Sequence, residues 1–416
     1  MHRLKALLCF AACALMLTAC AAQPVQSRPA GQDFTTVPGG AASSQTQAAP
    51  ADLSRMKYRA IWISYLDWKL LDTSSAQAFT KSAGAMFDNC VSLGLNVVIV
   101  QVRPFGDAVY PSKIFPWSHL VTGTQGKDPG YDPFAIMVEQ AHARGLAIEA
   151  WVNPYRVRLS DKMPESLADT NPALTHSDWA ISAENGLYYN PALPEVQKMI
   201  VDGAVEIVQN YAVDGLQFDD YFYPTTDPSF DTESYVALSG GKELSAWRRD
   251  NVNALVRSVY SAVKAARPTV QFGISPQGNN DQNYNTQYSD VGLWMSEPGY
   301  VDYIMPQVYW GYGYTLKSGS NRFAFENVTQ EWLAMPRHES VSLAFGLGAY
   351  RIGAGDGGQN DQTQWQSGHN LADMVKTLSA AEKANGYALY RYEQLFANSE
   401  YGTLAAAECE ALKSLQ

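Results

Sequence analysis

The sequence predicts an α/β protein, a (β/α)8 TIM barrel with long loops after its strands. Over about 360 residues, short β-rich runs alternate with amphipathic segments, which is the pattern of parallel βα units. Links from helix to strand are as short as Gly145 or Gly386, whereas links from strand to helix, such as Asn153–Leu193, are long. Long loops confined to the carboxyl ends of strands are typical of a barrel that builds its substrate cleft there.

The predicted strands are runs rich in β-branched, aliphatic and aromatic residues. An open, doubly wound sheet is the alternative, but its first strand usually leads into a glycine-rich phosphate loop. Here the first strand continues into Tyr65–Trp68, which favours the barrel. The eight predicted strands are Arg59–Ser64, Asn96–Val102, Leu146–Val152, Asp214–Asp219, Val270–Ser275, Val301–Pro306, Ser342–Leu347 and Tyr387–Tyr392.

The predicted helices have apolar residues at three- and four-residue spacing. In the first, apolar residues recur from Phe79 to Leu93, and Gly94 follows as a stop signal. The segment after the fifth strand, near Tyr288–Met295, has only a weak pattern. The other predicted helices are Phe134–Arg144, Pro194–Tyr211, Lys242–Ala266, Asn327–Met335, Leu371–Asn385 and Thr403–Leu415.

Residues 1–19 have the pattern of a signal peptide. Arg3 and Lys5 give a positively charged start, and the apolar run Leu7–Leu17 is too short to span a bilayer unaided. Small residues then precede Cys20, which resembles the lipobox of bacterial lipoproteins, in which this cysteine carries lipid and becomes the new N-terminus. An ordinary secretory signal is the alternative. The predicted location is the cell membrane or outer membrane, with the barrel outside the cytoplasm.

Two further segments complete the predicted domain organisation. Residues 20–54 are rich in Ala, Gln, Ser, Thr, Pro and Gly and have almost no large apolar side chains, so they are predicted to form a flexible tether. Residues 55–416 form one block with no second linker and no internal repeat, and this block is the predicted barrel domain.

The charge balance excludes some partners. Removing the signal peptide takes away two basic residues, which leaves 28 basic against 41 acidic residues and a net charge of −13. The sequence has no basic stripe to neutralise phosphates, so nucleic acid is not an expected partner. No later run approaches about 18 apolar residues, so no second segment is expected to cross a membrane.

Metal-dependent and acyl-transfer chemistry have little support in the sequence. The six histidines are scattered, and no His-Glu-x-x-His motif is present. A Gly-x-Ser-x-Gly nucleophile elbow is also absent. Besides Cys20, the mature chain keeps only Cys90 and Cys409, too few for a zinc cluster or a disulfide scaffold. We therefore expect neither a metal nor a cofactor.

The two remaining cysteines lie on the first and last predicted helices. These helices are neighbours in a closed barrel, so outside the cytoplasm a Cys90–Cys409 disulfide could close the seam. Such a bond requires the two Cα atoms to lie within about 7 Å of each other. Two separate buried thiols are the alternative.

Asp219 and Asp220 follow the fourth predicted strand and are the most informative feature of the chain. Because side chains alternate along a strand, Gln217 and Asp219 share one face, which we expect to be the barrel lumen. Glycoside hydrolysis needs two carboxyl groups, one to protonate the leaving oxygen and one to act as nucleophile or base. The alternative is that the two aspartates pair with arginines or cap the loop.

Other strand ends bring aromatic, amide and arginine side chains toward the same mouth. Such a mixture suits sugars, whose ring faces stack on Trp and Tyr while their hydroxyl groups need polar partners. Any one of these residues alone is as readily explained by packing, so it is their joint placement that indicates a site. They lie in the segments Gln101–Tyr110, Glu149–Arg156, Met305–Tyr312 and Tyr390–Glu393.

Six segments, together with the lipobox, resemble a known family. The segments are RAIWISYLDW, NVVIVQVRPFGDAVYPS, IEAWVNPYRV, DGLQFDDYFYP, FGISPQGN and DYIMPQVYWGY. They resemble glycosyl hydrolase-like family 10, bacterial barrel proteins that are often lipoproteins and include a division-site glycosidase that cleaves glycan strands stripped of peptides. The resemblance extends from about Arg55 to Phe396 and covers nearly the whole barrel.

The resemblance implies a catalytic aspartate at the end of the fourth strand, and the spacing from Gly215 to Asp219 fits this position. One departure is that a histidine is expected where Gln217 stands, which puts the activity or its pH optimum in question. The chitinase pattern Asp-Gly-x-Asp-x-Asp-x-Glu is not met either, because Gln217 and Tyr221 occupy two of its acidic positions. Substrate-assisted chitinase chemistry is therefore not expected.

The sequence thus predicts a monomeric, surface-anchored glycoside hydrolase that acts on a glycan. Asp219 is the predicted essential carboxylate, as nucleophile or acid/base, and the second carboxylate is Glu393, Asp220 or Asp107, in that order. A non-catalytic glycan-binding lipoprotein on the same barrel is the rival interpretation, motivated by Gln217. The predicted sugar-binding residues are Arg103, Asn153, Tyr155, Arg156, Gln217, Tyr221, Gln307, Tyr309 and Trp310.

The predicted substrate is peptidoglycan glycan without stem peptides. Lipid on Cys20 and a flexible tether would hold the barrel near the cell wall, and the family resemblance points to peptide-free glycan. Arg103 and Arg156 could bind the lactyl carboxylate of muramic acid, which removal of the peptide leaves free. The net charge of −13 opposes an anionic polymer over about one Debye length, so turnover should rise with moderate salt. A different surface or dietary polysaccharide is the alternative.

Overall fold

The structure is a computed structural model that describes residue 53 and residues 57–359 and 362–415. The predicted signal peptide, the predicted lipidation site Cys20 and nearly all of the predicted tether lie outside the described residues. Leu53, close to the end of that tether, is described, and its side chain is buried in a cluster inside the barrel.

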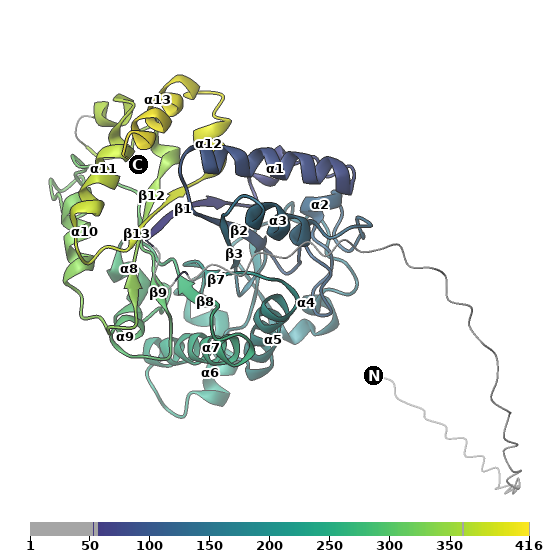
Figure 1. Ribbon diagram of the computed structural model, residues 1–416. Coiled ribbons are helices and arrows are strands. Elements are labelled where there is room, and N and C mark those ends of the chain that lie inside the picture. The colour runs from purple at the N-terminus through teal and green to yellow at the C-terminus, as the bar shows by residue number, and fades with distance from the viewer. Residues whose placement is uncertain (1–52, 54–56, 360–361, 416) are drawn as a thin grey trace, which may run out of the picture. The chain divides into compact units, whose positions relative to one another are not determined.

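A closed barrel of parallel strands forms the centre of the folded domain, and Figure 1 shows the strands surrounded by the main helices. The predicted (β/α)8 barrel is confirmed, and each of the eight predicted strands is present. In order around the barrel the strands are β1 (Tyr58–Ile63), β2 (Val97–Arg103), β3 (Ala147–Val152), β7 (Gly215–Phe218), β8 (Gln271–Ile274), β9 (Tyr303–Ile304) with β10 (Gln307–Val308), β11 (Ser342–Leu343) with β12 (Phe345–Gly348), and β13 (Gly386–Tyr390).

The sixth and seventh barrel strands are each divided in two by a short irregularity. Pro306, which has no N–H to give to the ladder, lies between β9 and β10. The ladder nevertheless continues, because the N–H groups of Ala344 and Gly346 donate to the carbonyls of Ile304 and Pro306. Since β13 also pairs with β1, the ring of strands is closed.

Every predicted helical segment contains a helix in the structure, including the segment with the weak pattern. Polar residues begin several of them: the side chain of Ser75 accepts from the Ala78 N–H, and that of Asp132 accepts from the Ala135 N–H. The main helices are α1 (Ala76–Ser92), α3 (Pro133–His142), α5 (Pro194–Asn210), α7 (Leu244–Ala266), α9 (Val291–Ser296), α10 (Phe325–Ala334), α11 (Asn370–Ala380) and α13 (Gly402–Lys413).

Alternation along the strands sorts side chains between the lumen and the helix layer. In β1, Tyr58, Ala60 and Trp62 belong to the inner cluster, whereas Ile61 and Ile63 pack toward the helices. The same rule turns the odd-numbered residues of β7 inward, so its carboxyl end delivers polar groups to the mouth of the barrel.

The lumen has a polar centre at Glu149. The hydroxyl of Tyr58 donates to one of its carboxyl oxygens at 2.7 Å, and the hydroxyl of Tyr303 donates to the other. Gly215 makes room for this carboxyl group, because a Cβ atom there would lie 2.6 Å from it. Burial raises the pKa of Glu149 to about 7, so a substantial fraction of this carboxyl group is protonated at neutral pH.

The loops at the carboxyl ends of the strands contain their own secondary structure. The loop after β3 forms a small antiparallel sheet in the order β4 (Arg156–Arg158), β6 (Gly186–Tyr189), β5 (Ala180–Ala183). A single 3-10 turn, η5 (Ala349–Arg351), follows β12. The short helices are α2 (His119–Thr122), α4 (Pro172–Thr175), α6 (Thr232–Leu238), α8 (Asn280–Asn285) and α12 (Tyr392–Phe396).

Cys90 and Cys409 are both buried free thiols, so the disulfide alternative is wrong and the two-thiol alternative is confirmed. The reason is α12, an additional helix that directly follows the last strand. It packs against α13, and the hydroxyl of its Tyr392 accepts from the side chain of Asn89 in α1 at 2.8 Å. Helix α12 therefore lies between the first and last helices of the barrel (Figure 1).

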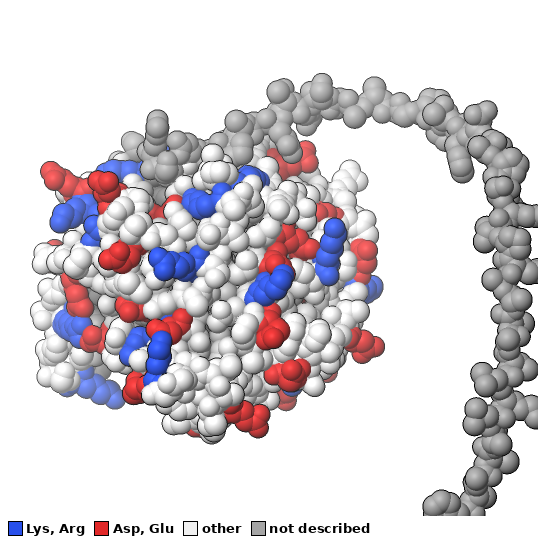
Figure 2. Space-filling model, turned by 90° about the horizontal axis from the view of Figure 1, so that it is seen from below, with Lys and Arg blue, Asp and Glu red and all other residues white. Residues whose placement is uncertain are grey.

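Charged side chains of both signs are scattered over the face shown in Figure 2, where Lys and Arg are interspersed with Asp and Glu. Several form ion pairs, such as Lys242 with Asp250 at 2.5 Å. Within the described part of the chain, no helix combines the length and the apolar character needed to cross a membrane.

Candidate active site

A pocket of about 280 Å³ opens at the carboxyl ends of the strands, and we call it the mouth pocket. Because all barrel strands are parallel, their carboxyl ends meet at one rim, and seven of them contribute to this pocket. Five predicted site residues line it, including both aspartates. The lining residues are Trp62, Trp151, Asp219, Asp220, Tyr221, Ser275, Gln307, Tyr309, Tyr350 and Tyr390.

Asp219 is held by three hydrogen-bond donors. Its Oδ2 atom accepts from the indole N–H of Trp151 at 3.1 Å and from the side-chain amide of Asn153 at 2.6 Å. Its Oδ1 atom accepts from the backbone N–H of Tyr221 at 3.2 Å. The residue is only 3% exposed, so these donors, rather than water, fix the direction of its carboxyl group.

Asp220 lies beyond the last residue of β7, where strand alternation no longer sets side-chain direction. Its side chain turns to the same pocket as that of Asp219. Its Oδ1 atom accepts from the amide of Gln307 at 3.1 Å, and its Oδ2 atom accepts from that of Gln287 at 3.3 Å. Both donors are neutral, so Asp220 has no ion-pair partner among these contacts.

The two carboxyl groups influence each other's protonation. Burial and the neighbouring charge of Asp220 raise the pKa of Asp219 to about 7, although Arg156 opposes the shift. Burial also raises the pKa of Asp220, against the hydrogen bonds from Gln287 and Gln307. Since two neighbouring carboxyl groups resist ionising together, the pair retains a proton near neutral pH.

Aromatic rings form the walls of the mouth pocket. The rings of Tyr309 and Tyr390 are stacked, with centroids 5.6 Å apart and planes 23° apart. Tyr350 stands at 90° to Tyr309, and Trp62 meets Tyr390 edge-on. Flat apolar faces next to amide and carboxyl groups match the two kinds of surface that a sugar ring presents.

Arg156 lies beside the mouth pocket but is not part of its lining. Its Nε atom donates to the carbonyl of Pro104 at 2.9 Å, and its guanidinium lies 4.9 Å from the centre of the Tyr221 ring. It is close enough to lower the pKa of Asp219, which places a positive charge near the aspartate pair.

Arg103, in contrast, lies away from the mouth pocket. It is 1% exposed, and its guanidinium sits 3.7 Å from the centre of the Phe115 ring. The register between β2 and β3 shifts between Gln101 and Arg103, so the alternation that would turn Arg103 toward the lumen is broken. It faces α5 instead, where a Cβ atom on Gly203 would lie 2.8 Å from its Nη1 atom.

Gln217 lies in the lumen below the mouth pocket. Its side-chain oxygen accepts from the indole N–H of Trp62 at 2.6 Å, and its amide donates to the hydroxyl of Tyr303 at 2.9 Å. Since Trp62 lines the pocket, Gln217 supports the lining from beneath rather than forming part of it.

The remaining predicted sugar-binding residues have different settings. Asn153 is completely buried and reaches the site through its hydrogen bond to Asp219. Tyr155 is also completely buried and meets the ring of Phe222. Trp310 is partly exposed and stacks on Phe323 at 5.0 Å, outside the lining of the mouth pocket.

Glu393 takes part in an ion-pair cluster at the end of β13. One of its oxygens lies 2.7 Å from Nζ of Lys69, and the other lies 2.6 Å from Nη1 of Arg391. The same arginine pairs with the buried Asp67 at 2.6 Å. Although burial opposes it, these cations lower the pKa of Glu393, so the group stays ionised and is not suited to donate a proton.

Asp107 connects parts of the loop after β2 through polar contacts. One of its oxygens accepts from the amide of Gln125 at 2.9 Å and contacts Nδ1 of His119 at 3.1 Å. The residue is completely buried and does not line the mouth pocket.

Several lining residues were not singled out from the sequence. Trp62 is signalled by strand alternation, because it shares a face with Tyr58 and Ala60. Trp151 and Tyr390 lie in strand-end segments that the sequence does mark. Ser275 and Tyr350 have no comparable signal, since their directions depend on where a strand ends and a turn begins.

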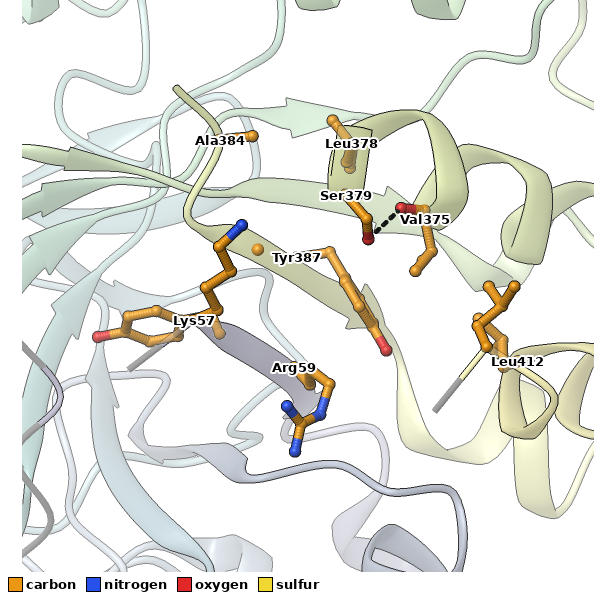
Figure 3. Close-up of a pocket in the computed structure, with 11 residues that line it drawn as sticks. Lys57, Arg59, Val375, Leu378, Ser379, Ala384, Tyr387 and Leu412 are labelled. Carbon is orange, nitrogen blue, oxygen red and sulfur yellow. Dashed lines mark hydrogen bonds between the residues drawn. The ribbon is translucent and has the colours of Figure 1, made fainter. Parts of the chain in front are cut away.

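A larger cavity, of about 460 Å³, lies at the amino ends of β1 and β13, and we call it the amino-end cavity (Figure 3). Lys57 and Arg59 contribute the basic groups, and aliphatic side chains from α11 and α13 form much of the rest. None of its lining residues is acidic. The lining residues are Lys57, Tyr58, Arg59, Val375, Leu378, Ser379, Ala384, Gly386, Tyr387, Leu412 and Leu415.

Metal chemistry has no visible ligand set. Across residue 53 and the ranges 57–359 and 362–415, no three His, Cys, Asp or Glu side chains come together in a way that could hold a metal ion. Two neighbouring carboxyl groups in a pocket with aromatic walls, at the mouth of a (β/α)8 barrel, form the kind of site that glycoside hydrolases use.

Comparison with known proteins agrees with this class. The chain belongs to the family Glycosyl hydrolase-like 10, whose sequence model matches residues 57–367. It is 38% identical over 322 residues to glycosyl hydrolase YngK of Bacillus subtilis (strain 168), covering 72% of this chain but only 62% of YngK. It is 32% identical over 423 residues to glycosyl hydrolase DigH of Escherichia coli (strain K12), covering 92% of each chain.

A solved structure shows the same fold. The glycoside hydrolase domain of PgaB (BpsB) from Bordetella bronchiseptica matches with a TM-score of 0.57 and 15% sequence identity. The match covers 86% of this chain and 98% of that one, so the likeness extends over the whole barrel.

Proposed function

We propose that this protein hydrolyses O-glycosidic bonds in glycan chains and that Asp219 and Asp220 carry the chemistry. The setting of the pair is the observation that supports this: two adjacent, buried carboxyl groups face one aromatic-walled pocket at the mouth of the barrel. Asp220 takes precedence over Glu393 and Asp107 as the second carboxylate, because neither of those two residues lines the pocket.

The retained proton gives the pair two complementary roles. One carboxyl group keeps the proton and donates it to the glycosidic oxygen, while the other is ionised. The ionised group either attacks the anomeric carbon or removes a proton from an attacking water. The bond from the anomeric carbon to the leaving oxygen breaks as the new bond forms, and the leaving group departs as a neutral alcohol. Where the carboxylate itself attacks, water then hydrolyses the resulting glycosyl ester, and the carboxyl group that gave up its proton removes one from that water.

The walls of the mouth pocket support a sugar as the bound group. Tyr309 and Tyr390 both line the pocket, and the parts of their rings that do not cover each other offer apolar surface to a sugar ring. The amide of Gln307 already donates to Asp220 and to the carbonyl of Ser275, so its position is fixed before a ligand arrives. Fixed polar groups of this kind orient hydroxyl groups with little loss of side-chain freedom.

We further propose that the substrate is the glycan of peptidoglycan from which the stem peptides have been removed. Without its peptide, muramic acid exposes a lactyl carboxylate. Arg156 is only 4% exposed, but its guanidinium lies 4.9 Å from the ring of Tyr221, which lines the pocket, and it is the cation that supports recognition of this group. Arg103 packs on Phe115, away from the pocket, and is not suited to that role. Lipid attachment at Cys20, which lies outside the described residues, would hold the barrel close to the wall.

The substrate proposal is tested by digesting purified sacculi before and after amidase treatment and analysing released fragments by mass spectrometry. We expect muramic-acid-containing fragments from amidase-treated sacculi and far fewer from intact ones. The Asp219→Asn variant is the matched control and should release none. Release from neither sample, together with activity on a neutral glycan, would contradict the substrate while keeping the chemistry.

Lipid attachment has its own test. Cells expressing the full chain and labelled with a radioactive fatty acid should incorporate label into the wild type but not into Cys20→Ser. Equal labelling of both proteins would contradict a lipid on Cys20.

A further inference from the structure

A chain of hydrogen bonds ends at Asp219 and begins outside the mouth pocket. The backbone N–H of Tyr65 donates to Oε1 of Gln101 at 2.8 Å. The amide of Gln101 donates to Oδ1 of Asn153 at 2.5 Å, and the amide of Asn153 donates to Oδ2 of Asp219 at 2.6 Å. Gln101 is 1% exposed and does not line the pocket, so it acts only through its neighbours.

The direction of this chain is set at its first member. A backbone N–H group can only donate, so Gln101 must present its oxygen to Tyr65 and its NH2 group to Asn153. Asn153 must then accept with its oxygen and turn its own NH2 group toward Asp219. Without that constraint, rotation of the Asn153 side-chain amide by 180° would present an oxygen to the carboxyl group instead.

Trp151 acts on the same oxygen of Asp219. Its indole N–H can only donate, and it lies 3.1 Å from Oδ2. Oδ2 therefore receives two donors that cannot reverse their roles. Oδ1 receives one donor, the backbone N–H of Tyr221 at 3.2 Å, against two on Oδ2, so Oδ1 is the favoured position for the proton when Asp219 is neutral.

We propose that Gln101 is a positioning residue for the reaction. It holds the Asn153 amide with its NH2 group toward Asp219, which keeps Oδ2 as an acceptor and assigns the mobile proton to Oδ1. The inference rests on the proposed function, in which Asp219 is one of the two reacting carboxyl groups. It adds a residue that touches neither the sugar nor Asp219 but determines which carboxyl oxygen exchanges the proton.

Removing the Gln101 amide releases this constraint. In Gln101→Met the Asn153 amide is free to turn its oxygen toward Asp219, which disfavours the ionised carboxylate and raises its pKa. Outer-shell residues that orient metal ligands typically contribute about 10- to 100-fold to activity, and we expect an effect of similar size for a residue that orients a donor to a reacting carboxyl group. We expect kcat to fall about tenfold or more with little change in KM, and the limb of the pH profile that reports Asp219 to move up by about one unit.

A double-mutant cycle tests whether Gln101 acts through Asn153. Gln101→Met, Asn153→Leu and the double variant are compared for kcat, KM and pH profile on peptide-free glycan. If Gln101 acts through Asn153, the second substitution adds almost nothing to the first. Gln197→Met is the matched control, because the amide of Gln197 donates to the carbonyls of Pro191 and Asn251, away from the pocket, and its loss should leave the pH profile unchanged.

A titration without substrate separates this inference from the proposed function. The carboxyl carbon of Asp219 is followed by NMR in protein labelled with ¹³C at aspartate, and Asp219→Asn identifies its signal. We expect a higher pKa for Asp219 in Gln101→Met than in the wild type. An unchanged pKa, or independent effects of the two substitutions, would overturn the role of Gln101, whereas full activity of Asp219→Asn would overturn the proposed function and leave the titration result standing.

Discussion

The two ends of the barrel each hold a cavity, and the two cavities differ in almost every respect. The amino-end cavity is larger, about 460 Å³ against about 280 Å³ for the mouth pocket. Its lining is mainly aliphatic, with Lys57 and Arg59 but no carboxyl group (Figure 3). The mouth pocket contains Asp219, Asp220 and six aromatic rings, and its carboxyl oxygens are held by fixed donors.

In the proposed function the smaller of the two cavities is the reactive site, so volume alone would point to the wrong end of the barrel. Chemistry needs groups that converge and whose protonation departs from the ordinary range, and of these two cavities the mouth pocket is the one in which two carboxyl groups, both with raised pKa values, come together. The contrast follows from topology, because the carboxyl ends of the strands carry the long loops and the amino ends carry short links.

The largest expected effect separates the two ends directly. Asp219→Asn should reduce kcat on the glycan about 1000-fold or more, equivalent to about 4 kcal/mol of transition-state stabilisation, because it removes one of the two reacting carboxyl groups. Lys57→Gln, its counterpart at the amino-end cavity, should change kcat less than about twofold. Both are measured by steady-state kinetics, with melting temperatures to confirm folding. Similar decreases in kcat for the two variants would contradict the proposal that the reaction takes place in the mouth pocket and not in the amino-end cavity.

The next effect concerns Glu149, in the lumen between the two ends. Burial raises its pKa from 4.5 to about 7, so the unfolded chain loses this proton first as pH rises, and native stability decreases from about pH 4.5 until pH exceeds 7. The loss amounts to about 3 kcal/mol. Glu149→Gln cannot ionise, so it should remove this part of the pH dependence.

Urea unfolding of Glu149→Gln and the wild type at pH 5 and pH 8 provides the measurement. The decrease in unfolding free energy between the two pH values should be smaller in the variant. Other buried carboxyl groups, such as Glu408, contribute equally to both proteins and cancel in the comparison. Identical pH dependence would show that Glu149 does not titrate in this range.

A matched pair of tyrosines sharpens the comparison of the two cavities. Tyr309→Ala removes an aromatic ring from the lining of the mouth pocket and should raise KM about fivefold, in line with about 1 kcal/mol for an aromatic contact. Tyr387→Ala removes a ring from the amino-end cavity and should leave KM unchanged, although both variants lose thermal stability. A raised KM in Tyr387→Ala would instead place part of the glycan at the amino end.

The smallest effect is expected at Glu393. Because Lys69 and Arg391 hold it as an anion away from the mouth pocket, Glu393→Gln should lower kcat less than about threefold. Its stability cost should be about 1 kcal/mol or less, as for other partly exposed ion pairs. Asp220→Asn, assayed beside it, should lose at least about 100-fold. The reverse order of these two losses would make Glu393 the second carboxylate.

The barrel could be predicted because its signals are local. Alternating strands and helices, short links on one side and long loops on the other can be recognised without knowledge of contacts. Asp219 and Asp220, which directly follow β7, were recognisable for the same reason, since their position after a strand places them at the mouth. The registers of β9 with β11 and of β10 with β12 could not be foreseen, because the interruption at Pro306 depends on how neighbouring strands complete the ladder.

The roles of individual polar residues depend on contacts between distant segments, and here prediction reached its limit. Arg103 turns to the helix layer because the register of β2 shifts by an irregularity that no residue type announces. The negative charge of Glu393 is balanced by an ion pair with Lys69, more than 300 positions earlier in the chain. The first and last helices of the barrel do not meet as expected, because α12, five residues long, separates the helices that carry Cys90 and Cys409.

The central claim is that the glycan is cleaved in the mouth pocket between Asp219 and Asp220. The most direct test is a crystal structure of Asp219→Asn soaked with a peptide-free glycan oligosaccharide. We expect a sugar ring against Tyr309 and Tyr390, with a glycosidic oxygen within hydrogen-bonding distance of the Asp220 carboxyl group. An oligosaccharide seated in the amino-end cavity, or one bound at the mouth with no glycosidic bond near Asp220, would contradict the claim.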